Sequence, residues 1–104
     1  MQHFHLLKIS EYRKEANDSA HISFEIPEEL QHEFLFRQGQ YLTLRFVFGE
    51  EDYRRSYSIV NAPSDKNPMP EILVKHLEDG IVSTHISRKL NLGDWVEVGA
   101  AQGH

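Results

Sequence analysis

Apolar and polar residues alternate with a period of two along most of this chain, which is the pattern of half-buried β-strands. Residues 21–26 alternate without interruption and are followed by Pro27. The alternation predicts six strands, over residues 4–12, 21–26, 41–48, 53–60, 71–77 and 95–98. Residues 28–36 carry only scattered apolar side chains, so we expect them to form a connection.

The period changes after Gly80. Val82, Ile86 and Leu90 lie four residues apart, so they share one face of a helix. Turn-forming residues at 91–94 end this helix before the last strand. Together these elements predict an all-β fold, a small closed six-stranded antiparallel Greek-key barrel with one short helix.

Composition narrows the possible ligands and compartments. The 104 residues suit one domain, and 39% hydrophobic with 26% charged residues argues against disorder. The net charge of −5 opposes binding to nucleic acid, so an anionic ligand needs a local positive site. The chain contains no cysteine, which excludes cysteine-held iron–sulfur clusters within it. We expect a cytoplasmic protein without a membrane segment, since no apolar run approaches roughly 20 residues.

The first candidate for ligand binding is the predicted strand over residues 53–60. Arg55 and Tyr57 lie two residues apart and therefore share one face, while Ser56 and Ser58 point to the other. A cation beside a flat aromatic ring suits a ligand that carries a phosphate next to a planar ring system. An ordinary strand with a surface arginine and a packed tyrosine is the simpler explanation of this pattern alone, because such strands are common.

The second candidate is the start of the predicted helix. Gly80 opens a tight turn, and the first amides of the following helix lack internal partners, which favours phosphate binding. A normal helix start capped by Ser83 or Thr84 is the simpler explanation of this segment alone. The two candidates together supply a cation, a ring platform and free amides, as an acidic chain would need to bind a dinucleotide.

Both segments also match known motifs. Arg55-Ser56-Tyr57-Ser58 is similar to the Arg-x-Tyr-Ser motif of the ferredoxin–NADP reductase superfamily, and Gly80-Ile81-Val82-Ser83 to its Gly-x-x-Ser motif. Residues 36–41 and 92–98 resemble two further family segments, each without the usual proline. The ordered set covers nearly the whole chain and resembles the FAD-binding domain of that superfamily. Reductases serving phenylacetyl-CoA oxygenases are the most similar group, followed by those of aromatic-ring dioxygenases.

The resemblance implies a set of FAD-binding residues: Arg55, Ser56, Tyr57, Ser58, Val74, Lys75, Gly80, Val82, Ser83 and Thr84. By this resemblance Arg55 pairs with the pyrophosphate, Tyr57 packs on the isoalloxazine ring and Ser58 bonds near its N5 and O4 edge. Residues 82–84 offer amides or hydroxyls to the pyrophosphate. Residues 74–75 lie beside the ribityl chain and ring, chiefly through their backbone.

The resemblance further implies an NAD(P)H-dependent flavin oxidoreductase, with residues 1–104 as the N-terminal FAD-binding barrel of a longer reductase. Electrons would pass from NAD(P)H, held by a C-terminal domain absent here, through flavin to an iron–sulfur domain or ferredoxin and an oxygenase component. A non-catalytic binding barrel or electron-transfer adaptor domain is the alternative. We assign no catalytic residue. We expect no metal site, because His3 and His5 share a strand face without a third ligand fixed nearby.

Overall fold

The computed structural model describes residues 2–103, and the ends of the expected domain, Met1 and His104, lie outside the described residues. The elements are β1 (Phe4–Glu15), β2 (Ser19–Glu25), the 3₁₀ helix η1 (Glu28–Phe34), β3 (Tyr41–Phe48), β4 (Glu51–Ser58), β5 (Glu71–Lys75), α1 (Ile81–Arg88) and β6 (Trp95–Gly99). All six predicted strands and the predicted helix are confirmed. The connection expected over residues 28–36 contains the additional helix η1.

Tight hairpins shift the ends of the predicted strands. Asn17 and Asp18 have φ angles of 61° and 55° and form the turn between β1 and β2, which lets β1 extend to Glu15. Asparagine and aspartate tolerate this left-handed conformation better than most residues. Gly49, with φ of 62°, forms the turn between β3 and β4, so β4 begins two residues earlier than predicted.

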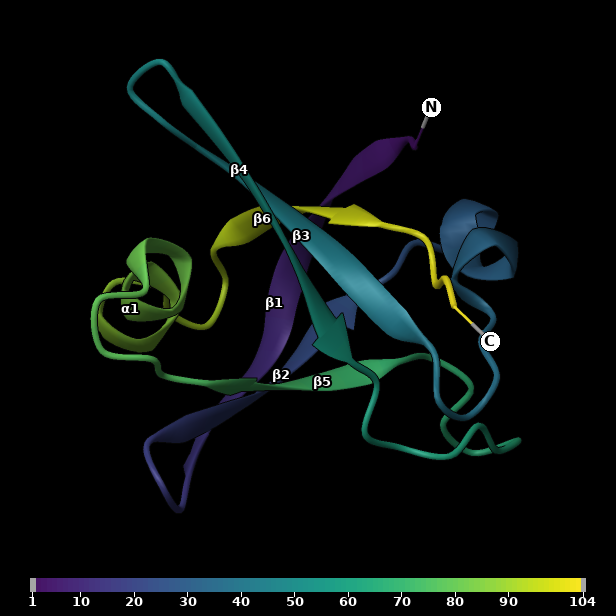
Figure 1. The fold of residues 1–104 in the computed structure, drawn as a ribbon. Helices are drawn as coiled ribbons and strands as arrows, with labels where there is room; N and C mark the ends of the chain where they lie inside the picture. Colours follow the sequence, from purple (N-terminus) through teal and green to yellow (C-terminus); the bar gives the residue numbers. More distant parts are fainter. Residues whose placement is uncertain (1, 104) are drawn as a thin grey trace.

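The strands form one antiparallel sheet in the order β4-β3-β6-β1-β2-β5. The curled sheet brings its two edge strands, β4 and β5, toward one another (Figure 1). They meet at the bridge between Ile59 and Ile72, beside a 2.9 Å hydrogen bond from Val60 N to Glu71 O. The Greek-key barrel is therefore confirmed, but the expectation of full closure is wrong, because no continuous ladder joins β4 to β5 within residues 2–103.

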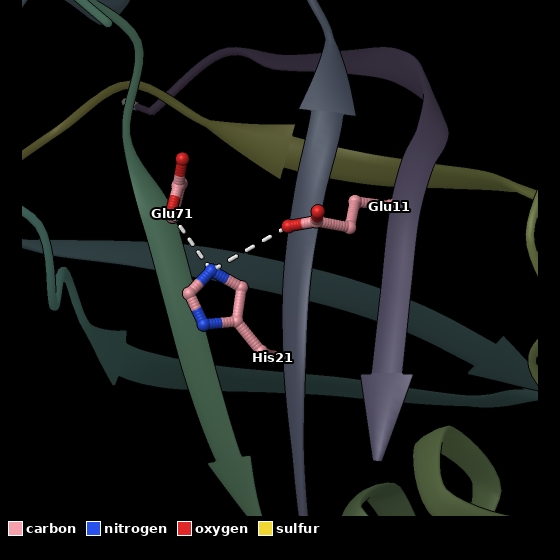
Figure 2. A group of neighbouring side chains, drawn as sticks. All are labelled: Glu11, His21 and Glu71. Atoms are coloured by element: carbon pink, nitrogen blue, oxygen red, sulfur yellow. Dashed lines mark hydrogen bonds and ion pairs between the residues drawn. The ribbon is translucent and has the colours of Figure 1, made fainter. Parts of the chain in front are cut away.

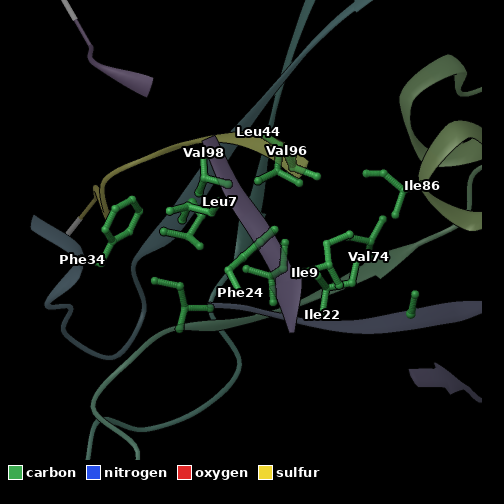
Figure 3. Close-up of a cluster of buried hydrophobic side chains, with 14 of the residues drawn as sticks. Leu7, Ile9, Ile22, Phe24, Phe34, Leu44, Val74, Ile86, Val96 and Val98 are labelled. Atoms are coloured by element: carbon green, nitrogen blue, oxygen red, sulfur yellow. The ribbon is translucent and has the colours of Figure 1, made fainter. Parts of the chain in front are cut away.

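Side chains from every strand and both helices fill the concave side of the sheet (Figure 3). Val82 and Ile86 of α1 are almost fully buried, as the four-residue spacing predicted, and η1 contributes Phe34. Leu90 lies beyond the end of α1 but packs against the same core. The core thus fixes α1 against the end of β5, where the chain turns at Gly80. Among residues 2–103, no helix is long and apolar enough to cross a membrane.

Candidate functional site

A cleft of about 200 Å³ lies where β4 and β5 diverge beyond the Ile59–Ile72 bridge. Its lining comes from three consecutive residues of β4, the end of β5, and the turn that leads into α1. The lining residues are Arg55, Ser56, Tyr57, Lys75, Leu77, Gly80, Ile81, Val82 and Ser83. The open seam of the sheet therefore brings together the two sequence segments that were predicted to bind a ligand.

Strand pairing directs Arg55 and Tyr57 toward this cleft. Arg55 is paired with Leu44 and Tyr57 with Leu42, and both leucines are buried core residues. Cross-strand partners point to the same face of a sheet, so Arg55 and Tyr57 extend from the inner face. Burial raises the pKa of Tyr57 to about 12, although the Arg55 charge opposes the shift. Its phenol consequently stays neutral at physiological pH and offers a hydroxyl donor beside an aromatic face.

Two cationic residues, Arg55 and Lys75, line the cleft. Among residues 2–103, no ion pair involves Arg55 or Lys75, whereas Arg45 and Arg54 both contact Asp52. Arg55 instead donates from Nη1 to the carbonyl oxygen of Arg54 at 2.9 Å. Because the chain as a whole is acidic, two uncompensated cations in one small cleft form a local site for an anion.

The turn before α1 depends on the missing side chain of Gly80. A Cβ at this position would lie 2.6 Å from Ser83 Oγ and 3.1 Å from Leu77 O. Gly80 N donates to Leu77 O at 2.9 Å, and Thr84 N makes the first intrahelical bond to Gly80 O. The amides of Ile81 and the two residues after it precede that bond, so they lack intrahelical acceptors and carry the positive end of the helix dipole.

The hydroxyls of Ser83 and Thr84 are already engaged within the protein. Ser83 Oγ accepts from Leu77 N at 3.0 Å, and Thr84 Oγ1 lies 3.1 Å from His76 Nε2. The other nitrogen of His76 lies 2.9 Å from Asp18 Oδ2. Hydrogen bonds from Arg88 and His76 lower the pKa of the Asp18 carboxyl. Both hydroxyls therefore hold the start of α1 in place, which leaves backbone amides as the donors available to a ligand.

Three of the ten predicted site residues do not line the cleft. Ser58 is exposed at the end of β4, Thr84 contacts His76, and Val74 is buried in the core. Ser56 lines the cleft although its hydroxyl lies 3.1 Å from Thr43 Oγ1. Ile81 was not among the predicted site residues, although it lines the cleft and its amide lies at the start of α1.

A second, larger cleft of about 620 Å³ borders the same turn. It is lined by Phe48, Asp79, Gly80, Ile81, Thr84, His85 and Lys89. The His85 ring lies 4.8 Å from the Phe48 ring, and burial lowers its pKa, as does the nearby charge of Lys89. Gly80 and Ile81 border both clefts, so the two form neighbouring compartments around the start of α1.

The chain matches one protein family and is similar to three known proteins. Residues 6–104 match the model of the family described as oxidoreductase FAD-binding domain. A component of the 1,2-phenylacetyl-CoA epoxidase of Escherichia coli (strain K12) is 35% identical over 100% of this chain and 29% of its own length. The ferredoxin reductase component of 3-ketosteroid-9-alpha-monooxygenase from Rhodococcus rhodochrous is 32% identical over 89% of this chain and 26% of its own length.

A solved structure of phthalate dioxygenase reductase has the same fold. It superposes with a TM-score of 0.76 at 26% identity, covering 97% of this chain and 30% of that protein. That reductase is described as a modular structure for electron transfer from pyridine nucleotides to [2Fe-2S]. The present chain spans less than a third of the length of each of these three relatives.

Proposed function

This chain belongs to the oxidoreductase FAD-binding domain family, and from that premise we propose that it is the flavin module of a longer NAD(P)H-dependent electron-transfer reductase. The observation that carries the proposal is the cleft at the open seam. There, Arg55 and Lys75 supply unpaired positive charge, Tyr57 supplies a neutral aromatic platform, and the start of α1 supplies free amides. These are the groups that a ligand with a planar ring and a pyrophosphate requires.

The residues present fit FAD on physical grounds. The donors are cationic or amide groups without a competing carboxylate in the lining, so they favour a dianionic pyrophosphate. Gly80 has no side chain, and this lets the turn fold closely against Ser83 and keeps the free amides accessible. We therefore assign FAD contacts to Arg55 and Tyr57 through side chains, and to Lys75 and residues 81–83 through the backbone.

The two compartments suit the two ends of a dinucleotide. At about 200 Å³, the seam cleft is smaller than the roughly 300–1,000 Å³ common for ligand pockets, whereas the second cleft falls in that range. Gly80 and Ile81 border both, so a pyrophosphate at the start of α1 would have one compartment on either side. We place the isoalloxazine end beside Tyr57 and the adenine end in the apolar cleft beside Phe48 and His85.

Bound flavin supplies the redox chemistry, accepting a hydride from a nicotinamide and passing electrons onward singly. The role that we propose for the residues of this chain is to bind and orient the flavin. We assign no proton transfer to them. Tyr57 keeps its hydroxyl proton at physiological pH, so it offers a hydrogen bond without adding negative charge beside the ring. Arg55 would hold the phosphate end, and Lys75 would add positive charge nearby.

The wider assignment follows the relatives. Their descriptions name a component of an epoxidase, a ferredoxin reductase component of a monooxygenase, and electron transfer from pyridine nucleotides to [2Fe-2S]. We accordingly propose that this chain is the N-terminal part of a reductase whose further domains hold NAD(P)H and an iron–sulfur centre, or which reduces a ferredoxin, in support of an oxygenase. A cytoplasmic location and a role in phenylacetate degradation are parts of the same proposal.

Titration with FAD tests the proposal against the alternative of a binding barrel without flavin. We expect saturable quenching of flavin fluorescence with one FAD per chain. The absence of any saturable change up to about 50 micromolar FAD, an affinity weaker than about −6 kcal/mol, would contradict the proposal if circular dichroism shows that the protein is folded.

A further inference from the structure

Three neighbouring strands each contribute one side chain to a compact polar group that the flavin assignment does not use. The group consists of Glu11 from β1, His21 from β2 and Glu71 from β5, and Figure 2 shows the two carboxylates on either side of the imidazole. His21 Nε2 lies 2.8 Å from Glu71 Oε1 and 3.8 Å from Glu11 Oε1. The three ligand atoms all lie within 4.8 Å of one another.

Strand register explains why these residues meet. Ser23 on the central strand β2 is paired with Glu11 on one side and with Glu71 on the other. His21 lies two residues along β2 and points to the same face, within diagonal reach of both carboxylates. A register shift between Ile9 and Glu11 aligns Glu11 with this face. The group is thus fixed by the backbone of three hydrogen-bonded strands and not by flexible loops.

An ion pair between His21 and Glu71 accounts for only part of this geometry. A proton on His21 Nε2 can form a hydrogen bond to Glu71 Oε1 at 2.8 Å, but Glu11 Oε1, at 3.8 Å from the same nitrogen, is beyond hydrogen-bond distance. With the imidazole neutral the group carries two negative charges, and Arg13, at 3.1 Å from Glu11 Oε2, offsets one of them. A divalent cation placed between the three ligand atoms would contact all of them and more than offset the remaining negative charge.

The distances and environment suit a small transition-metal ion. Zinc bonds of roughly 2.0–2.2 Å to nitrogen and oxygen place tetrahedral ligand atoms about 3.4 Å apart. The two histidine–carboxylate distances here are 2.8 and 3.8 Å, and all three ligand atoms lie within 4.8 Å of one another. Asn67 Nδ2 donates to Glu71 Oε2 at 2.5 Å and Ser23 Oγ to Glu11 Oε1 at 3.4 Å, and such outer hydrogen bonds orient ligating carboxylates. The His21 side chain is 15% exposed and that of Glu11 46%, which leaves an entry path.

We propose that Glu11, His21 and Glu71 form a zinc-binding site with three protein ligands and a remaining position open to water. One imidazole nitrogen with two carboxylates matches zinc, whereas magnesium prefers an all-oxygen octahedral shell. The bound ion would link β1, β2 and the edge strand β5. This assignment does not depend on the flavin, because the three ligands lie outside both clefts. The sequence predicted no metal site, and this proposal departs from that expectation.

Isothermal titration of the full chain with zinc chloride tests this site, with manganese and magnesium chlorides titrated in parallel. We expect one zinc per folded chain, bound at least about 10-fold more tightly than manganese, with magnesium weaker still. His21→Gln should weaken zinc binding by at least about 10-fold. Glu11→Gln should do the same and has little risk of unfolding the protein, since nearly half of the Glu11 side chain is exposed.

His5→Gln is the matched control. His5 Nε2 also lies 2.8 Å from a carboxylate, that of Glu33, but no second carboxylate is recorded near it within residues 2–103. Its replacement should leave zinc affinity unchanged, which separates the proposed site from general binding to the seven histidines. The proposal is overturned if zinc binds no more tightly than magnesium, or if neither Glu11→Gln nor His21→Gln changes the zinc isotherm.

Discussion

Replacement of Arg55 by alanine should weaken the binding of FAD far more than the binding of riboflavin. Arg55 has no ion-pair partner among residues 2–103; its side chain donates to the Arg54 carbonyl oxygen and lies 5.8 Å from the centre of the Tyr53 ring. The free protein therefore loses little when this side chain is removed. What is lost is a charged donor toward the phosphates, which FAD carries and riboflavin lacks.

The size of the effect follows from the type of contact. A hydrogen bond to a charged group contributes roughly 1.5–3 kcal/mol, which corresponds to about 10- to 150-fold in affinity. We expect a loss of that size for FAD and less than about 3-fold for riboflavin. The free energy of unfolding should change by no more than about 0.5 kcal/mol, as is usual for exposed side chains without a structural role.

Arg54→Ala is the matched control, because it removes the same charge from the adjacent residue. Arg54 contacts Asp52 at 3.5 Å and the Phe4 ring at 5.1 Å, and it does not line the seam cleft. Fluorescence titrations of the wild type and both variants with FAD and with riboflavin measure the effect. The reasoning fails if Arg55→Ala weakens both ligands equally, or if Arg54→Ala weakens FAD binding as much as Arg55→Ala does.

Three further predictions concern the same region. Gly80→Ala should reduce the free energy of unfolding by about 1–3 kcal/mol in urea titrations, because its Cβ would collide with Ser83 Oγ; unchanged stability would contradict this. One tyrosine should titrate near pH 12 when followed by ultraviolet absorbance, and Tyr57→Phe should remove that phase. Because burial raises the pKa of Tyr57 above 10, its contribution to the free energy of unfolding is complete below pH 10 and is lost between pH 10 and 12. Burial lowers the pKa of His85 below 6.5, so the contribution of His85 to stability is present above pH 6.5 and is lost as the pH falls. His85→Gln should therefore flatten the decline of the urea midpoint below pH 6.5. An unchanged dependence of the urea midpoint on pH would contradict this prediction.

The sequence predicted the strands because each has one face turned toward the core. Alternation identified all six, and the spacing of Val82 and Ile86 identified α1. Closure of the barrel was predicted wrongly, since alternation shows which residues face inward but not whether two edge strands come close enough to pair. That outcome depends on the twist accumulated over the whole sheet, which no local pattern reports.

The site was harder to predict than the fold for a related reason. Arg55, Tyr57 and Gly80 were assigned from local pattern and motif, and they line one cleft as expected. The hydroxyls of Ser83 and Thr84 were predicted as possible ligand contacts. In the structure Ser83 Oγ accepts from Leu77 N and Thr84 Oγ1 contacts His76. Such competition between partners, like the meeting of Glu11 with Glu71 across β2, depends on distant segments and leaves no trace in sequence spacing.

The inward-facing position of Arg55 explains why the seam between β4 and β5 stays open. Arg55 is paired with Leu44, a core residue, and therefore occupies an inward-facing position where continued alternation would place an apolar side chain. Burying an unpaired guanidinium there would cost several kcal/mol, so β4 and β5 cannot close over it. Charged residues on edge strands also oppose pairing with a second chain. The break in the hydrophobic pattern thus keeps the barrel open at the place where an anionic ligand can neutralise the charge, as is expected where local rules of folding yield to function.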